Sequence, residues 1–405
     1  MLSNEQQILL QYLYDYKTLS LRQAWQAAFA DKYNEAGQEW FHSEISPLMD
    51  AGLISLKANS FAGYRLELTG PGIGELCKIK GLPRFRYNEK GTRLPTLKFP
   101  SQLLIQDHLS AHQISLNQFL FDFRDIWASV MPHTNLSYTI EVEQLSEKYD
   151  YFRPDAEITI SSPTKTALHL YIEQDMGQES RKMMRLKWER YRRYIEARRG
   201  DQSFGSMIML FIINYDTSMP APHHLDFNNM PWCIDYRKRD VFLSMPYLYS
   251  EMLDGFFDTY TGTESEIINC VFTKLLPTFT GTYKNPVDSW LHTLPFLKDA
   301  TTSQATSLAD MFGGVSFQRF SRILEDGHIK HNIAYVSDDP TFLPTSIFAK
   351  ATHMQRVNQT LGGTIAGAPK IIYLMHDQNG VIQDGLERLS KDIGITHDSQ
   401  YLQLI

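Results

Sequence analysis

The chain has 405 residues, more than the roughly 250–300 residues that a single core usually reaches, so we expect more than one domain. Its hydrophobic content of 43% and aromatic content of 12% exclude a disordered protein and fit a large folded core. The net charge of −7 excludes a general binder of polyanions. Any contact with nucleic acid must therefore come from a local basic patch.

Membrane and secreted classes are also disfavoured. The longest apolar run, Met207–Ile213, is far shorter than the ~20 residues that cross a bilayer. The polar N-terminal segment does not resemble a signal sequence. Three cysteines at unrelated spacings, Cys77, Cys233 and Cys270, suggest neither a disulfide framework nor a metal site. We expect them to be small buried side chains in a cytoplasmic protein.

Residues 1–79 are predicted to form a winged helix-turn-helix domain. Apolar periodicity indicates three helices and then two strands, at Gln6–Tyr16, Leu19–Phe29, Glu35–Asp50, Leu53–Lys57 and Tyr64–Leu68. A fourth helix is expected after Thr69 and Gly70. Three helices followed by a hairpin is the winged-helix order, in which the third helix enters the major groove of DNA.

The predicted third helix carries few cations. Lys57 and Arg65, on the two strands of the hairpin, are the candidates for phosphate contacts in this domain. A winged helix that contacts protein instead of DNA therefore remains an alternative.

Residues 80–100 are predicted to be a basic linker. Prolines keep such a segment extended, and aromatic residues alternate with six basic residues against one acid: Lys80, Arg84, Arg86, Lys90, Arg93 and Lys98 against Glu89. The linker could lie along a nucleic-acid backbone, or it could be a solvated tether.

Residues 101–250 are predicted to form an α/β domain with a mixed sheet. The expected order is two helices, three strands, a helix and a buried strand, at Leu103–His112, Leu116–Ser129, Leu136–Val142, Ala156–Ile160, Ala167–Glu173, Ser180–Arg198 and Ser206–Asn214. Asp235–Tyr249 is expected to extend or cover this sheet.

Residues 251–405 are predicted to be a C-terminal α/β extension or a second domain. We expect loops between short elements over Tyr260–Thr306, and a helix over Ser307–Glu325 that is interrupted at Gly313-Gly314. A strand, a helix and a strand are expected to follow, at Lys370–Met375, Val381–Asp392 and Gln400–Leu404.

Acidic residues near strand ends suggest a metal site in the α/β domain. Asp155 opens one predicted strand and Glu173 ends the next, so both carboxylates can reach one edge of the sheet. Magnesium prefers oxygen ligands and commonly uses one or two carboxylates. The backbone carbonyl of Gln174 would be a third ligand, and Asp175 lies on the same strand face as Glu173 and could assist.

The helix that follows is strongly basic. Between Gln178 and Gly200 there are nine Lys or Arg and three Glu, a net charge of about +6. The helical pitch of 100° per residue places Lys187 beside the buried stripe, where it can reach the edge of the sheet. Four arginines on the other side are predicted to contact the DNA backbone: Arg181, Arg185, Arg192 and Arg199.

These motifs resemble the PD-(D/E)XK restriction-endonuclease-like superfamily, and more narrowly the plasmid replication-relaxation family. The resemblance rests on Thr69-Gly70, Arg153-Pro154-Asp155-Ala156, Glu173-Gln174-Asp175-Met176-Gly177 and the basic helix from Lys187 to Tyr194. It covers somewhat over half of the chain. It implies an Mg²⁺-dependent nuclease fold that acts on double-stranded plasmid or mobile-element DNA in replication, relaxation or transfer, with replication or transfer proteins as further partners.

One position departs from the superfamily pattern. A lysine usually follows two residues after the second carboxylate, and here that position is Asp175. Either Lys187 substitutes for it, or the site has lost catalysis and the protein is a DNA-binding regulator that keeps the fold as a platform. A scaffold that contacts only protein is a third possibility. The sequence predicts neither the oligomeric state nor the DNA sequence recognised.

Overall fold

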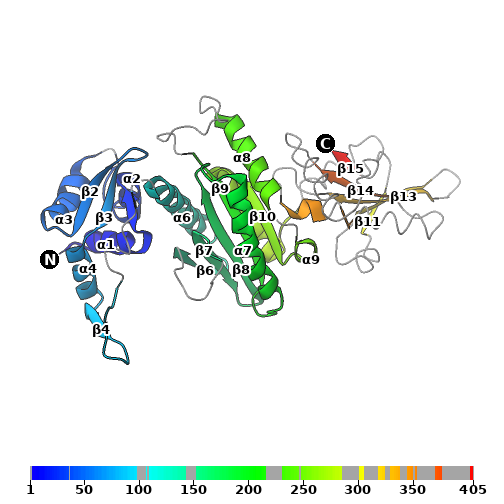
Figure 1. The fold of residues 1–405 in the computed structure, drawn as a ribbon. Coiled ribbons are helices and arrows are strands. Elements are labelled where there is room, and N and C mark those ends of the chain that lie inside the picture. Colours follow the sequence, from blue (N-terminus) through cyan, green and yellow to red (C-terminus); the bar gives the residue numbers. More distant parts are fainter. Residues whose placement is uncertain are drawn as a thin grey trace. The chain divides into compact units, whose positions relative to one another are not determined.

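In a computed structural model the chain divides into two compact units (Figure 1). The first comprises Met1–Thr134 and Asn214–Leu225, and the second comprises Asn135–Ile213 and Asp226–Ile405. The structure describes residues 2–35, 37–97, 106, 109–142, 152–215, 230–245, 248–284, 301–304, 318–323, 329–337, 344–349, 352–353, 370–375 and 402–404. Half of the residues of the predicted helix over Leu103–His112, and all of those of Val381–Asp392, lie outside the described residues.

The first unit begins with helices around a small sheet. Its elements are α1 (Asn4–Tyr16), β1 (Thr18–Ser20), α2 (Leu21–Ala28), the π-helical turn η1 (Phe41–Ile45), α3 (Ser46–Asp50), β2 (Ile54–Asn59), β3 (Gly63–Leu68) and α4 (Gly70–Ile79). The antiparallel sheet has the order β1-β3-β2. The third helical segment is shorter than predicted and starts after Glu35. The helix, helix, helix, hairpin order matches the prediction.

Capping residues fix the helix starts of this unit. Ser3 and Ser20 each form a capping box with the glutamine three residues later, which satisfies free N–H groups at the helix start. Thr69 caps α4 and also donates to the Leu53 carbonyl at 2.8 Å. A Cβ at Gly72 would lie 2.1 Å from that carbonyl oxygen. Only glycine therefore allows α4 to pack this closely.

Two elements of the first unit differ from the prediction. Residues expected to be an extended linker form a hairpin, β4 (Phe85–Tyr87) and β5 (Arg93–Pro95). One continuous helix, α6 (Ser110–Val130), replaces part of two predicted helices. The fully buried Asn117 on α6 donates to the carbonyls of Tyr16 and Thr18, at 3.2 and 2.6 Å. These bonds join α6 to the first unit and not to the central sheet unit, where we had predicted it.

The second unit contains a five-stranded mixed sheet with the order β10-β9-β8-β7-β6. The strands are β6 (Ser137–Val142), β7 (Ala156–Ser162), β8 (Lys165–Asp175), β9 (Ser206–Ile213) and β10 (Phe257–Gly262). The first three pair antiparallel, and β8, β9 and β10 pair parallel. The mixed α/β sheet is as predicted. The end of β10, from Tyr260 to Gly262, lies in the region where short elements joined by loops were predicted.

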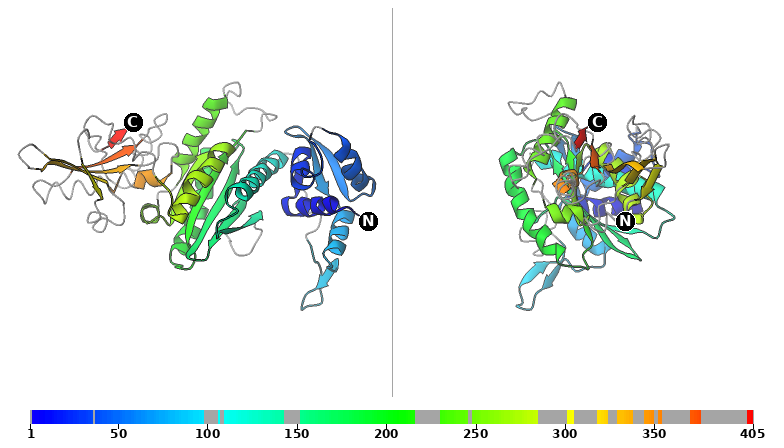
Figure 2. Two further views of the ribbon diagram at one scale, coloured as in Figure 1. Left: turned by 180° about the vertical axis from the view of Figure 1, so that it is seen from behind. Right: turned by 90° about the vertical axis from the view of Figure 1, so that its right-hand side faces the viewer.

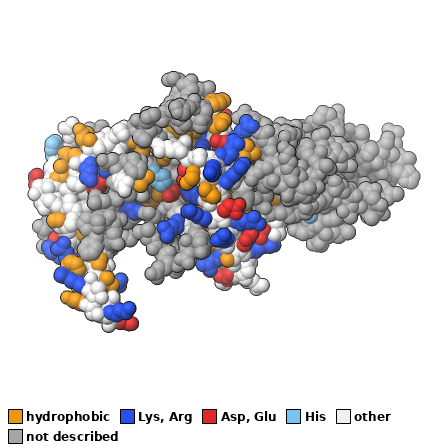
Figure 3. Space-filling view, in the orientation of Figure 1, with side chains coloured by type: hydrophobic (Ala, Val, Ile, Leu, Met, Phe, Trp, Pro, Cys, Tyr) orange, Lys and Arg blue, Asp and Glu red, His pale blue; other side chains and the backbone are white. Residues whose placement is uncertain are grey.

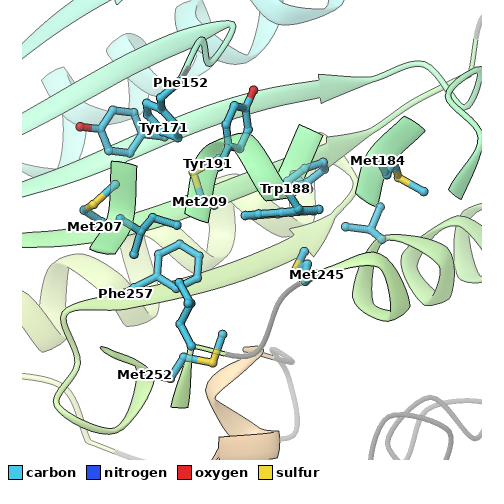
Figure 4. Packing of buried hydrophobic residues seen from close by; sticks show 14 of the residues in the cluster. Phe152, Tyr171, Met184, Trp188, Tyr191, Met207, Met209, Met245, Met252 and Phe257 are labelled. Atoms are coloured by element: carbon cyan, nitrogen blue, oxygen red, sulfur yellow. The ribbon is translucent and has the colours of Figure 1, made fainter. Parts of the chain in front are cut away.

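Helices cover both faces of this sheet (Figure 2). Helices α7 (Arg181–Arg199) and α8 (Met230–Ser244) share one face, and α10 (Glu264–Cys270), η4 (Val271–Leu275) and α11 (Leu276–Thr280) follow β10. The described part of segment Asp235–Tyr249 thus covers the sheet instead of extending it. Figure 4 shows the core under α7, where Trp188 stacks on Phe211 of β9 with ring centroids 5.5 Å apart. This packing holds α7 at a fixed height over β8.

A second five-stranded sheet comes from the C-terminal part. Its strands are β11 (Thr301–Gln304), β12 (Gln318–Ile323), β13 (Ile329–Ser337), β14 (Lys370–Met375) and β15 (Leu402–Leu404). Three antiparallel strands are followed by two parallel ones, the same order and directions as in the first sheet. The predicted strands at Lys370–Met375 and Gln400–Leu404 are found. The helix predicted over Ser307–Glu325 is wrong where it is described, because Gln318–Ile323 is a strand.

Two smaller expectations can be checked. The three cysteines are buried and none of them forms a disulfide, as predicted. Within the described parts of the chain, no helix has the length and apolar character that a membrane crossing requires.

Candidate active site

Asp155 and Glu173 lie together at one end of β7 and β8. Ala156 is in register with Ile172 across the antiparallel pair, so the residues just beyond, Asp155 and Glu173, are neighbours. The Asp155 N–H donates to the Ile172 carbonyl at 2.9 Å. The Gln174 N–H donates back to Asp155 Oδ2 at 2.8 Å. These two bonds fix the first carboxylate beside the second.

Glu173 is almost fully buried, with 1% of its surface exposed. Lys187 Nζ of α7 donates to Oε2, and the Tyr191 hydroxyl donates to Oε1. The same hydroxyl lies 3.1 Å from the Arg153 carbonyl and can donate to only one acceptor at a time. Both oxygens of Glu173 are therefore bonded from α7, by side chains one helical turn apart.

Burial raises the pKa of Glu173 to about 7. The charge of Lys187 and the bonds from Lys187 and Tyr191 act in the opposite direction, and the negative charge of Asp155 adds to the increase. Near neutral pH, Glu173 therefore exchanges a proton easily.

Lys187 is positioned as the cation of the site. Burial lowers its pKa, but the charges of Glu173, Asp155 and Glu179 outweigh that effect, so its pKa is raised. Its side chain keeps 27% exposure, and Glu179 Oε1 lies 3.9 Å from Nζ. Lys187 therefore keeps its charge, and its side chain is partly exposed. Burial and then Glu173 also raise the pKa of Tyr191, which keeps its hydroxyl protonated.

The donor set suits a hard cation with few protein ligands. Within the described residues no group of three or more His, Cys, Asp or Glu side chains could hold a metal. Two adjacent carboxylates, however, are what Mg²⁺ commonly takes from a protein, with water or phosphate completing the octahedron. Asp155 and Glu173 fit this requirement. The Gln174 carbonyl as a third ligand stays a prediction, since this residue contacts Asp155 through its N–H.

Asp175 does not join this group, contrary to our expectation. Arg237 of α8 binds its carboxylate with two nitrogens, Nη2 to Oδ1 at 2.8 Å and Nε to Oδ2. Arg237 also donates to the Glu179 carbonyl at 2.6 Å, and both charged side chains are buried. The sequence gives no spacing signal for this pair, because it depends on how α8 docks. Asp175 therefore has a structural role in closing α8 onto β8.

The arginines on the other side of α7 are largely paired with acids. Arg181 binds Asp240 of α8, with Nε 2.9 Å from Oδ1. Arg199 binds Asp254 at 2.7 Å, just after α9 (Tyr249–Leu253), and Arg192 binds Glu196 of its own helix at 2.7 Å. Arg181 and Arg199 thus tie α7 to its neighbours, which the sequence could not reveal. Arg185 alone of the four is exposed with no partner among the described residues.

Cations remain on the outer surface of α7. Figure 3 shows Lys and Arg side chains gathered over this helix, with hydrophobic side chains among them. The exposed members that have no described acidic partner are Lys182, Arg185 and Arg190, and the exposed apolar members are Met183 and Leu186. The basic surface is therefore smaller than predicted.

The two cations predicted for the N-terminal domain are both bound to Glu67. Arg65 is 1% exposed, with Nη2 3.0 Å from Glu67 Oε1, so it cannot reach a phosphate as we had predicted. Lys57 lies 2.6 Å from Glu67 Oε2 and keeps 42% exposure. The reason is their register, since Lys57 faces Arg65 across β2 and β3 and the buried Glu67 sits between them.

Comparison of the sequence with known protein families and with curated proteins finds no match.

Proposed function

We propose that this protein processes DNA with a magnesium-dependent, nuclease-like core centred on Asp155, Glu173 and Lys187. The observation that carries the proposal is their convergence: two carboxylates fixed by backbone bonds at one strand end, with the ammonium of a basic helix bonded to one of them. Core packing does not require this arrangement. A buried glutamate is expensive to retain unless its charge is used.

The proposed chemistry is hydrolysis of a phosphodiester. Asp155 and Glu173 would hold Mg²⁺, which when bound polarises the phosphate and lowers the pKa of a water molecule. The Lys187 ammonium would leave Glu173 and stabilise the negative charge that develops on the phosphate oxygens. Tyr191 keeps the Glu173 carboxylate oriented meanwhile. Glu173 must release its proton before it can be a ligand, so we expect metal binding to release a proton.

The finer fold assignment belongs to the same proposal. An antiparallel β6-β7-β8 meander, followed by α7 and the parallel strand β9, supports a restriction-endonuclease-like core. The α1 to β3 order supports a winged helix at the N-terminus. A role in replication, relaxation or transfer of plasmid or mobile-element DNA rests on the sequence resemblance.

One observation favours a second candidate, a non-catalytic DNA-binding regulator. Glu173 is closed off by Lys187 and Tyr191 and is 1% exposed. Metal binding would need these side chains to move. If they do not move, the site is a structural ion pair, and the fold serves as a platform for binding DNA.

Cleavage of supercoiled plasmid with and without Mg²⁺ separates the two candidates. We expect wild-type protein to nick the plasmid only with Mg²⁺, and Asp155→Ala and Glu173→Ala to lose activity by at least ~100-fold, an effect typical of lost transition-state stabilisation. Glu189→Gln removes an exposed acid of α7 and is the control. Equal nicking by all variants, or none by wild type, would eliminate the catalytic proposal.

A further inference from the structure

The β4–β5 hairpin is a second basic feature, built independently of α7. From Lys80 to Leu97 the segment that contains it carries five cations and one acid, a net charge of +4 on a chain of net charge −7. Most of its residues are exposed, and Tyr87 is 70% exposed. Figure 1 shows the hairpin extending beyond the end of α4, away from the β1-β3-β2 sheet, and Figure 3 shows Lys and Arg side chains along it.

The hairpin is held in shape by its own bonds. At the tip, Asn88 Oδ1 accepts from the N–H groups of Lys90 and Thr92, at 3.0 and 2.8 Å. Gly91 takes φ = 72°, the left-handed conformation that glycine adopts without strain. At the base, the Thr96 N–H donates to the Arg84 carbonyl at 3.2 Å. The arm is therefore ordered, unlike a solvated tether.

Its two faces differ in chemistry. Phe85 and Tyr87 share one face with Arg93, because Tyr87 pairs with Arg93 across the strands. The Arg93 guanidinium lies 3.7 Å from the centre of the Phe85 ring, which orients it without neutralising its charge. Arg86 alternates onto the opposite face, and the guanidinium of Arg84, just before β4, lies 5.7 Å from the centre of the Phe85 ring. Lys80, Arg86 and Lys90 have no acidic partner among the described residues, unlike the paired arginines of α7.

We infer that the β4–β5 hairpin is an arm that inserts into a groove of double-stranded DNA. A two-stranded ribbon fits the major groove. Exposed arginines that have no acidic partner can bind the phosphates along the edges of that groove. The acidic chain as a whole repels DNA, so contact requires such a local projection. Single-stranded DNA is less suited, because its binding needs a row of stacking rings and the hairpin exposes only one. The inference rests on the proposed function, since it names the duplex as its partner.

The test measures binding of the full chain to a fluorescently labelled 30-base-pair duplex across a series of salt concentrations. The variant Arg84→Gln/Arg86→Gln removes two cations of the hairpin that have no acidic partner among the described residues. The control Arg22→Gln/Lys78→Gln removes the same charge from the same unit, at exposed cations already paired with Glu35 and Glu75. Thermal melting of each variant checks that it is folded. Tyr87→Ala tests the aromatic face without changing the charge.

We expect the hairpin variant to lose about 10-fold or more in affinity and to lower the salt slope of log K by ~1.8, for two lost phosphate contacts. The control should change affinity less than twofold, and Tyr87→Ala should weaken binding several-fold. The inference is overturned if the hairpin and control variants bind equally. Tighter binding to a single strand than to the duplex, or no duplex binding by wild type, overturns it as well.

The outcomes distinguish this inference from the proposed catalysis. If the hairpin variant binds normally while Asp155→Ala abolishes nicking, the inference about the hairpin is wrong and the nuclease proposal stands. If wild type never nicks but its duplex binding depends on Arg84 and Arg86, the catalytic proposal fails and the arm stands.

Discussion

Two buried acids of β8, two residues apart on the same face, have opposite environments. Asp175 has a fixed bidentate partner, Arg237, and its charge is fully matched. Glu173 shares one lysine with Asp155 and Glu179, so negative charge is in excess there. An arginine that donates to both oxygens of a carboxylate neutralises its charge and occupies both oxygens. A single lysine cannot neutralise several carboxylates, so a metal cation can still be attracted to them. This difference separates Asp175, the structural acid, from Glu173, the candidate metal ligand.

The largest expected difference is in activity. Glu173→Gln keeps the size of the side chain and should lower Mg²⁺-dependent nicking by about 100-fold or more. Asp175→Asn, a matched buried acid, should keep activity within a few-fold at temperatures where the variant is folded. Rates from plasmid nicking, with circular dichroism to verify folding, give the comparison. If both variants lose activity equally, the two acids do not differ in role.

Stability should show the opposite ranking. Arg237→Met leaves the buried Asp175 carboxylate without its cation, and we expect a loss of about 3–5 kcal/mol in the free energy of unfolding. Lys187→Met should cost less, about 1–3 kcal/mol, because Glu173 can take up a proton near pH 7. Urea unfolding at pH 7 measures both. A larger loss for Lys187→Met would contradict the assignment.

The pH dependence of stability should come from Glu173. Its pKa of about 7 in the folded state lies above its ordinary value of 4.5, so the folded protein binds its proton more tightly than the unfolded chain. Stability should therefore fall as the pH rises from 4.5 to 7, by at most about 3 kcal/mol. Lys187 stays charged across this window. Glu173→Gln should remove this fall, and Asp175→Asn should retain it in denaturant titrations at several pH values.

The smallest expected effect concerns Tyr191. Its ring is part of the core, and its hydroxyl can donate to Glu173 or to the Arg153 carbonyl. Tyr191→Phe keeps the ring, so we expect a loss of about 0.5–1.5 kcal/mol in stability and less than a 10-fold loss in nicking rate. The pH midpoint of stability should move upward, because one bond that lowers the pKa of Glu173 is lost. An unchanged midpoint would show that the hydroxyl does not serve Glu173.

Much of the fold was predictable because local patterns determine it. Apolar periodicity located α1, α2 and α7, and the continuous apolar run located β9. The pairing of Asp155 with Glu173 followed from adjacent strands, and the position of Lys187 followed from helical pitch. These inferences use only spacing within an element or between neighbours in the chain.

The errors arose where distant segments meet. Arg237 and Asp240 neutralise Asp175 and Arg181 across more than fifty residues of sequence, and Arg65 is buried by strand register against Glu67. The sequence alone does not show whether a charged side chain contacts solvent, a phosphate or another helix of the protein. The hairpin at Phe85–Pro95 was missed because its prolines and charges resemble those of a linker.

The central claim is that Asp155 and Glu173 form a metal site and Asp175 does not. Isothermal titration calorimetry of the metal-free protein with Mn²⁺ at pH 8 measures metal binding without relying on activity. We predict one saturable site per chain in wild type and in Asp175→Asn, with affinity at least ~10-fold weaker in Asp155→Asn and Glu173→Gln. Equal affinity in all four proteins, or no saturable binding in wild type, would contradict the claim.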